Sequence, residues 1–167
     1  EELIINKGKK KILKKGIKKL SEYTLEYDYL ILATGSKPIV PPFEGLDKIP
    51  YYTIWTIPDA IKIRDYAEKH HIKNAVIVGG GFIGLEMAEN LVKKGVKVKI
   101  IEMMDQVMPP IDKEIAQFIH QELILNGVCL VLEDPVDSFG KKDQNKPFVK
   151  TKSGRVIETD LVILSIG

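Results

Sequence analysis

The chain has 167 residues, about the length of one domain, with 44% hydrophobic residues, 29% charged residues and a formal net charge of +2. This balance is that of an ordinary globular protein, and the small net charge argues neither for nor against a nucleic-acid partner. No apolar run reaches the ~18 residues of a membrane span, so we expect no membrane partner. A single cysteine excludes an internal disulfide framework and fits a cytoplasmic location.

The N-terminal segment alternates short apolar runs with glycines and lysines, which predicts a small antiparallel β-structure. Strands are expected at 3–5, 11–20 and 23–26. Gly8 and Gly16 are the expected turn points. Eight lysines and no acid lie between Lys7 and Lys19. They indicate either an anion-binding patch or, more simply, a solvated hairpin whose lysines protect strand edges. The run contains no aromatic residue on which a base could stack, so we expect no nucleic-acid partner.

A short apolar run and a proline-rich segment follow. The run 30–32 is expected to be a buried strand, and it leads directly into Ala33, Thr34 and Gly35. Three of the five residues at 38–42 are prolines, which cannot form helix or central strand. We therefore expect a linker between two structural units here.

The remainder of the chain alternates helices and apolar strands. Helices are expected at 58–71, 82–94 and 112–126, and strands at 74–78, 97–102, 128–132 and 161–166. Three short antiparallel strands are expected at 135–139, 147–151 and 156–158, with turns at 140–142 and 153–154. Alternating units with apolar strands predict an α/β fold, Rossmann-like, with a parallel sheet covered on both faces. The late antiparallel β-meander would cover one face in place of a crossover helix.

The segment 79–84 is the most informative motif, because a Gly-x-Gly-x-x-Gly follows an apolar strand and opens a helix. Gly79 allows a tight turn, Gly81 allows a pyrophosphate to approach the backbone, and Gly84 allows the helix to pack closely on the strand. The free N–H groups and the positive dipole at a helix start suit a phosphate. This pattern predicts a dinucleotide site, and its alternative is a glycine turn in an ordinary strand–helix unit.

Glu102 ends the second strand of this unit and lies 23 positions after Gly79, close to the roughly 20 residues expected for the acid that binds an adenosine ribose. Its carboxylate accepts both ribose hydroxyls and repels a 2′-phosphate, and no arginine follows within several residues. The sequence therefore favours NAD(H) over NADP(H) as the cofactor. The alternative for Glu102 is a solvent-exposed acid at a strand end.

Several motifs in this order resemble the flavin-dependent pyridine nucleotide–disulfide oxidoreductases. They are the segments 27–36, 56–60 and 79–86, then Glu102 with Met108 and Pro109, and the segment 159–167. The segment 102–112 is most similar to the branch of coenzyme A-disulfide reductases and NADH oxidases or peroxidases. In proteins of this family, the polypeptide builds part of an FAD domain, inserts an NAD(P) domain and then returns to the FAD domain.

This resemblance implies a division of the chain. Residues 1–42 would be a partial FAD-binding domain, 43–163 the NAD-binding domain, and 164–167 the start of the return to the FAD domain. The FAD fingerprint, the redox cysteine and the dimerisation domain of the family are not in the sequence, which we expect to be a piece of a homodimeric protein. The parent would pass hydride from NADH to FAD and on to a disulfide, peroxide or oxygen, whereas the piece alone would bind NADH without turnover.

The resemblance also assigns roles to individual residues. Backbone groups of Gly79, Gly81, Phe82, Ile83 and Gly84 would hold the NAD pyrophosphate. Glu86 would face the nicotinamide and the flavin, although it could instead only balance the helix dipole. Ile166 and Gly167 would pass close to the nicotinamide ribose, and the turn formed by Ala33, Thr34 and Gly35 would approach FAD.

The remaining reactive residues indicate no further chemistry. Cys129 lies in an apolar strand, which is typical of a small core residue rather than a redox thiol. His120 lies in the middle of a helix and is expected to be exposed. No spacing of His, Cys, Asp or Glu resembles a metal site. A rival function from another class is a non-catalytic module that senses NAD and regulates a partner.

Overall fold

The computed structural model describes residues 2–5, 12–15, 24–25, 28–29, 31–142 and 145–166. The chain divides into two compact units, Glu1–Ser36 and Lys37–Gly167. In the first unit, three antiparallel strands form a sheet in the order β1-β2-β3. Their bounds are Glu2–Ile5, Ile12–Lys15 and Thr24–Leu25. The predicted antiparallel β-structure is confirmed, while Gly8 and Gly16 lie outside the described residues.

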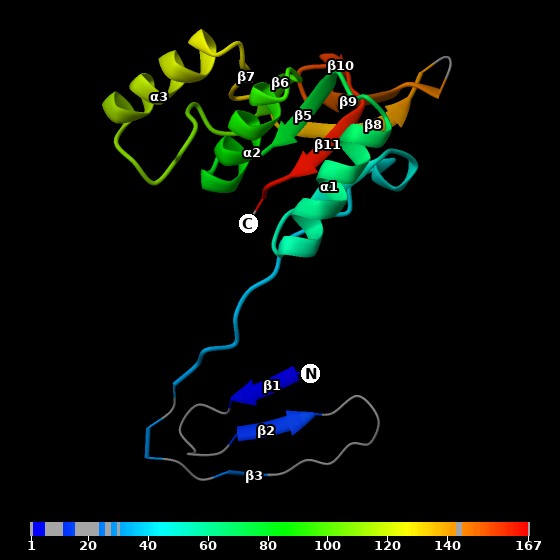
Figure 1. The fold of residues 1–167 in the computed structure, drawn as a ribbon. Coiled ribbons are helices and arrows are strands. Elements are labelled where there is room, and N and C mark those ends of the chain that lie inside the picture. The colour runs from blue at the N-terminus through cyan, green and yellow to red at the C-terminus, as the bar shows by residue number, and fades with distance from the viewer. Residues whose placement is uncertain are drawn as a thin grey trace. The chain divides into compact units, whose positions relative to one another are not determined.

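A parallel sheet forms the centre of the second unit, with the strand order β4-β11-β5-β6-β7. Figure 1 labels four of these strands, β11, β5, β6 and β7. The strands are β4 (Tyr51–Thr53), β5 (Asn74–Val78), β6 (Lys97–Ile101), β7 (Cys129–Val131) and β11 (Leu161–Leu164). β5 and β11 are nearly continuous apolar runs because layers cover both of their faces. The register pairs Val78 with both Leu164 and Ile101, so three neighbouring strands end at one edge of the sheet.

Three helices connect or flank these strands, and each begins and ends within two residues of its predicted bounds. They are α1 (Ile57–Lys69), α2 (Phe82–Lys93) and α3 (Lys113–Leu125). α1 begins at a capping box in which the Thr56 amide donates to the Asp59 carboxylate at 2.9 Å. Gly95 and Gly127 follow α2 and α3 with φ of 78° and 80°, the left-handed conformation that stops a helix.

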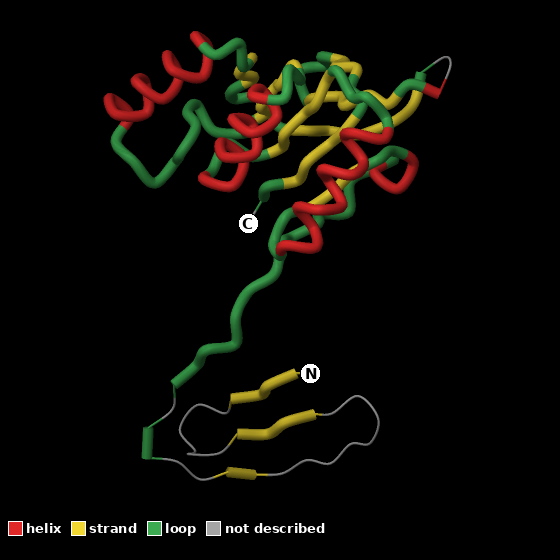
Figure 2. Tube along the Cα trace, viewed as in Figure 1, coloured by secondary structure: helices red, strands yellow, loops and turns green. Residues whose placement is uncertain are grey.

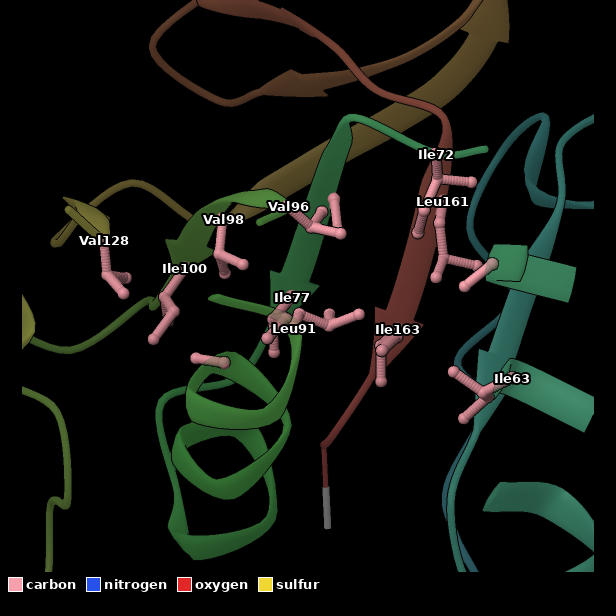
Figure 3. Packing of buried hydrophobic residues seen from close by; sticks show 13 residues of the cluster. Ile63, Ile72, Ile77, Leu91, Val96, Val98, Ile100, Val128, Leu161 and Ile163 are labelled. Carbon is pink, nitrogen blue, oxygen red and sulfur yellow. The ribbon is translucent and has the colours of Figure 1, made fainter. Parts of the chain in front are cut away.

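The helices α1 and α2 pack on one face of the sheet (Figure 2). Figure 3 shows the apolar cluster between these helices and the sheet. Ile77, Ile100 and Ile163, from three neighbouring strands, contact Leu91 of α2 and Ile63 of α1. All five side chains are buried. Burying a side chain of this size contributes about 1.5–3 kcal/mol, so this cluster holds both helices against the strands.

A β-meander covers the other face of the sheet. Its strands are β8 (Val136–Lys141), β9 (Pro147–Thr151) and β10 (Val156–Glu158), paired antiparallel in the order β10-β9-β8. Phe139 and Val149 of the meander pack with Val76 and Val162 of the sheet and with Leu46 of the short 3₁₀ helix η1 (Leu46–Lys48). The predicted α/β class, the parallel sheet and the meander in place of a crossover helix are confirmed.

Some predicted elements are wrong. The run 30–32 is not a buried strand: where the structure describes it, Ile31 and Leu32 lie in an extended loop and are 88% and 58% exposed. An apolar run becomes a strand only when a neighbour pairs with its backbone. The predicted turn at 140–142 is also wrong, because β8 continues through Lys141. The ring of Phe148 lies over Gly140, where a Cβ atom would approach it to 2.6 Å.

The strand β4 is an element that the sequence did not predict. It is only three residues long and partly exposed, and it lies at the edge of the sheet beside β11. It begins with Tyr51 and Tyr52. Three residues are too few to show the alternation of apolar and polar side chains that predicts a strand. The pairing of Tyr52 with Ile163, more than a hundred residues later in the chain, defines this strand.

Candidate functional site

The carboxyl edge of the parallel sheet carries a pocket. The strands β5, β6 and β11 end side by side, and the next residues are Gly79, Glu102 and Ser165. In open α/β sheets, ligands bind at the carboxyl ends of the strands, at the point where the strand order reverses. The pocket has a volume of about 660 Å³, within the range of cofactor sites. Its lining includes Phe43, Gly79, Gly81, Phe82, Ile83, Glu102, Met103, Met108, Pro109, Pro110, Ser165 and Ile166.

The glycines of the fingerprint meet different requirements. Gly79 has φ of 106°, and a Cβ atom there would lie 2.6 Å from the carbonyl oxygen of Ser165. A Cβ atom on Gly84 would lie 2.2 Å from the carbonyl oxygen of Gly79, so only glycine lets α2 pack this closely on β5. A Cβ atom on Gly81, which lines the pocket, would meet nothing within 4 Å. The first and third glycines therefore serve the fold, and the second keeps the pocket open.

The start of α2 offers hydrogen-bond donors to this pocket. The first intrahelical bond is donated by Leu85 to the carbonyl oxygen of Gly81. The amides of Phe82, Ile83 and Gly84 therefore precede the helical ladder, as the first N–H groups of any helix do. The N-cap residue is Gly81, which has no side chain to accept a hydrogen bond from these amides, and no acid lies in the first turn of α2. This combination suits a negatively charged group.

Glu102 lies within the wall of the pocket and is only 8% exposed, so it is not a solvent-exposed acid at a strand end. Its Oε2 accepts a hydrogen bond from the Gly80 amide at 2.7 Å, and its Oε1 accepts one from the Met104 amide at 2.9 Å. A carboxylate offers about four acceptor positions, so each oxygen keeps capacity for a further donor such as a ribose hydroxyl. Glu102 also ties the glycine turn to the end of β6.

Two supporting features were missed in the sequence. Ser165, directly after β11, donates its hydroxyl to the carbonyl oxygen of Gly79 at 2.8 Å. In the loop after β6, the Met108 amide donates to the carbonyl oxygen of Gly80 at 2.8 Å, and Met108 has φ of 53°, which is uncommon for a residue other than glycine. A polar residue at the end of an apolar strand was the available signal for Ser165, whereas nothing in the sequence indicated the Met108 contact.

The other predicted site residues are not all brought together. Glu86 lies on the exposed side of α2 and lines two flanking pockets rather than the one that the glycines line. Ala33, Thr34 and Gly35 belong to the first unit, where they are exposed and outside any strand. Gly167 lies outside the described residues, and its neighbour Ile166 does line the glycine pocket.

Two further expectations are corrected. His120 is buried rather than exposed, because it follows Ala116 by four positions and shares with it the inner side of α3. Its Nε2 accepts a hydrogen bond from the Val107 amide at 3.1 Å. Cys129 is exposed rather than a core residue, because it begins β7, which lies at the edge of the sheet.

The described part of the chain shows neither a metal-ligand cluster nor a membrane-spanning helix. No group of three or more His, Cys, Asp or Glu side chains in it is arranged to hold a metal ion. None of the helices among these residues combines the length and the hydropathy that crossing a bilayer requires.

Comparison with known proteins gives a consistent result. The sequence profile of the family described as "Pyridine nucleotide-disulphide oxidoreductase" matches residues 2–167. An NADH oxidase of Methanocaldococcus jannaschii is 36% identical over 149 residues, which cover 88% of this chain and 33% of the relative. An NAD(P)H sulfur oxidoreductase (CoA-dependent) of Pyrococcus abyssi is 40% identical over 147 residues, or 87% of this chain and 32% of the relative. The chain thus spans about a third of the length of these curated relatives.

Solved structures show the same similarity. Reduced CoADR-RHD of Bacillus anthracis superimposes with a TM-score of 0.76 and 42% identity, covering 99% of this chain and 30% of that one. The water-forming NADH oxidase of Lactobacillus brevis, solved bound to NADH, has a TM-score of 0.76 and 30% identity, and covers 99% of this chain and 36% of its own.

Proposed function

We propose that this chain, which belongs to the pyridine nucleotide-disulphide oxidoreductase family, is the NADH-binding part of a flavin-dependent oxidoreductase. The longer protein would pass hydride from NADH to FAD and then to a disulfide, a peroxide or oxygen. When bound, the two cofactors supply the electron transfer itself, and the protein supplies binding, orientation and electrostatics. The 167-residue chain would bind NADH without turnover, because it spans only a third of its curated relatives.

The observation that carries this proposal is the open space at Gly81, which lines the same pocket as the start of α2 and Glu102. A pyrophosphate placed against Gly81 would meet the amides of Phe82 and Ile83 and the positive end of the helix dipole. The adenosine ribose would then lie toward Glu102, which has acceptor capacity left on both oxygens. Ile166, at the end of β11, would lie beside the nicotinamide half of the cofactor.

The same carboxylate favours NADH over NADPH. Glu102 is held in place by two backbone amides and cannot readily turn away from a 2′-phosphate. The loop from Met103 to Ile111 contains no arginine or lysine that would pair with such a phosphate. One of the similar solved structures is an NADH oxidase bound to NADH, which agrees with this preference.

Other proposed roles depend on the rest of the polypeptide. Glu86 is exposed beside the pocket and would face the nicotinamide and flavin only after an FAD domain covers it. Ala33, Thr34 and Gly35 would form part of that FAD domain, which we assign to residues 1–42. The proline-rich segment 38–42 would then be the crossing into the NAD-binding domain at 43–163. The names of the relatives favour this oxidoreductase over a non-catalytic NAD sensor.

The proposal is tested by titrating the 167-residue chain with NADH and NADPH and following the amide signals by NMR. NADH is expected to shift the signals of residues 79–84 with saturation in the micromolar to millimolar range, and NADPH to bind more weakly. The variant Gly81→Val should fold but lose binding, whereas Lys93→Ala, at the far end of α2, should bind as the unmodified chain does. An absence of binding at millimolar NADH would contradict the proposal.

A further inference from the structure

His120 is a buried imidazole that the proposed binding of NADH does not use. It projects from the middle of α3 and is 7% exposed. Its Nε2 accepts the hydrogen bond from the Val107 amide, so in the neutral ring the proton resides on Nδ1. Val107 itself is fully buried, so its amide has no water to replace this acceptor. A buried amide without an acceptor is costly, so the contact fixes the position of the loop at Val107.

The residue held by His120 adjoins the wall of the nucleotide pocket. Met108 follows Val107, lines the pocket and donates its amide to the carbonyl oxygen of Gly80. The amide of Gly80 in turn donates to Glu102. A Cβ atom on Gly80 would lie 3.0 Å from the side chain of Val107, so the loop and the glycine turn are in direct contact. A continuous series of short contacts therefore joins His120 to both the glycine turn and the ribose-binding carboxylate.

The charged groups around this imidazole are few in the described part of the chain. Asp105, on the same loop as Val107, is the carboxylate that acts on His120, and it forms an ion pair with Lys113 at the start of α3. Glu133 and Glu114 act on Lys113 rather than on the imidazole. Burial lowers the pKa of His120 from its usual 6.5, and the negative charge of Asp105 opposes this shift only in part. His120 is therefore neutral near pH 7, as the contact to the Val107 amide requires.

We propose that His120 is a positioning residue of the dinucleotide site, whose neutral Nε2 holds the Val107 amide and thereby keeps Met108 and the Gly80 turn in the arrangement that binds the nucleotide. This inference rests on the proposed function. Protonation of His120 replaces the acceptor lone pair by an N–H group that faces the Val107 N–H. The two donors repel, the loop leaves its position, and the fraction of molecules able to bind falls, so the apparent affinity falls by the same fraction.

The experiment compares three variants with the unmodified 167-residue chain. His120→Leu removes the acceptor while keeping an apolar side chain, and it should weaken NAD⁺ binding about tenfold at neutral pH. His120→Gln retains an oxygen that can accept from the Val107 amide, and it should restore most of the affinity. Gln121→Leu, a substitution of the exposed neighbour on the same helix, is the matched control and should bind normally. NAD⁺ is used because it is stable in acid.

The decisive readout is the pH profile. In the unmodified chain, NAD⁺ affinity and the NMR signal of the Val107 amide should change together as the pH falls below the pKa of His120. In His120→Gln, neither should follow that titration, because the amide does not ionise. Equal affinity of His120→Leu and the unmodified chain, or an unchanged pH profile in His120→Gln, would overturn the positioning role. If His120→Leu does not fold, the pH profiles of the other two proteins decide the question. If the unmodified chain binds no nucleotide at any pH, the proposed function itself fails.

Discussion

The hydroxyl of Ser165 donates to the carbonyl oxygen of Gly79 at 2.8 Å and joins the end of β11 to the first turn of the fingerprint. The same hydroxyl lies 3.0 Å from the carbonyl oxygen of Val78, which also accepts the Ser165 amide. A Cβ atom on Gly84 would approach that hydroxyl to 2.8 Å. The turn that is proposed to receive a pyrophosphate is thus held in place by a hydrogen bond from the end of the neighbouring strand.

The variant Ser165→Ala tests the contribution of this hydrogen bond. It removes the hydrogen bond to Gly79 but leaves the backbone bond to Val78, so the expected loss of stability is about 1 kcal/mol. Chemical denaturation measures the change. Nucleotide affinity should fall as well, because the glycine turn loses its fixed position. Unchanged stability and affinity would show that the turn is held by its backbone alone.

The second and third glycines of the fingerprint should respond differently to the same small substitution. Gly84→Ala places a methyl group 2.2 Å from a carbonyl oxygen, so we expect a loss of stability of about 1–3 kcal/mol. Gly81→Ala adds a methyl group to a residue that lines the pocket, with no neighbour within 4 Å, so stability should change by less than about 0.5 kcal/mol.

Nucleotide titration separates these two variants further. Gly81→Ala should lose affinity without losing stability, whereas any loss in Gly84→Ala should accompany partial unfolding. Thermal unfolding and NADH titration of both proteins provide the comparison. If Gly81→Ala bound NADH as tightly as the unmodified chain, the pyrophosphate would have to lie elsewhere.

Cofactor preference is best tested next to Glu102 rather than at it. Replacing Glu102 removes the acceptor of two backbone amides, so a change in cofactor preference would be mixed with a structural change. Met103 is 66% exposed and lines the same pocket, so Met103→Arg adds a positive charge with little cost to the fold. The ratio of NADPH to NADH affinity should rise at least about fivefold, because arginine pairs with a 2′-phosphate. Met103→Gln is the neutral control, and an unchanged ratio would mean that the ribose lies away from this loop.

Acid stability should depend on Asp134, which precedes the β-meander. Its carboxylate accepts hydrogen bonds from the hydroxyl and the amide of Ser153 at 2.6 and 2.9 Å, and these bonds hold the pKa of Asp134 below its usual 3.8. The unfolded chain therefore takes up a proton at a higher pH than the folded one, and stability falls as the pH drops through this range. Asp134→Asn should lose less stability between pH 5 and pH 3 than the unmodified chain, as measured by melting temperature.

Much of the second unit could be predicted because its signals are local. The strand at Asn74–Val78 and the helix stops at Gly95 and Gly127 follow from apolar runs and from glycine conformations within a few residues. The glycine fingerprint and its spacing to Glu102 also predicted a dinucleotide site, and the structure places Gly79, Gly81 and Glu102 in the lining of one pocket.

The unpredicted features depend on residues that are distant in sequence. Ser165 bonds to Gly79 across 86 positions, so no window along the chain contains both partners. His120 lies on the buried side of α3. The helix was predicted, but the Val107 amide that donates to the imidazole lies in a loop outside it and carries no local signal. The strand at 30–32 failed for the same reason, since an apolar run does not reveal whether a neighbouring strand is present to pair with it.

The position of β11 has a consequence for the order of folding. This strand lies between β4 and β5, which precede it by more than eighty residues, and among the described strands β4 pairs only with β11. During synthesis, the segment from β5 to β7 emerges complete with α2 and α3. The five-stranded sheet cannot be completed until residues 161–164 have left the ribosome. Contacts of such long range form slowly. The pocket at the carboxyl edge, which Ser165 and Ile166 after β11 help to line, is therefore among the last features of the domain to form.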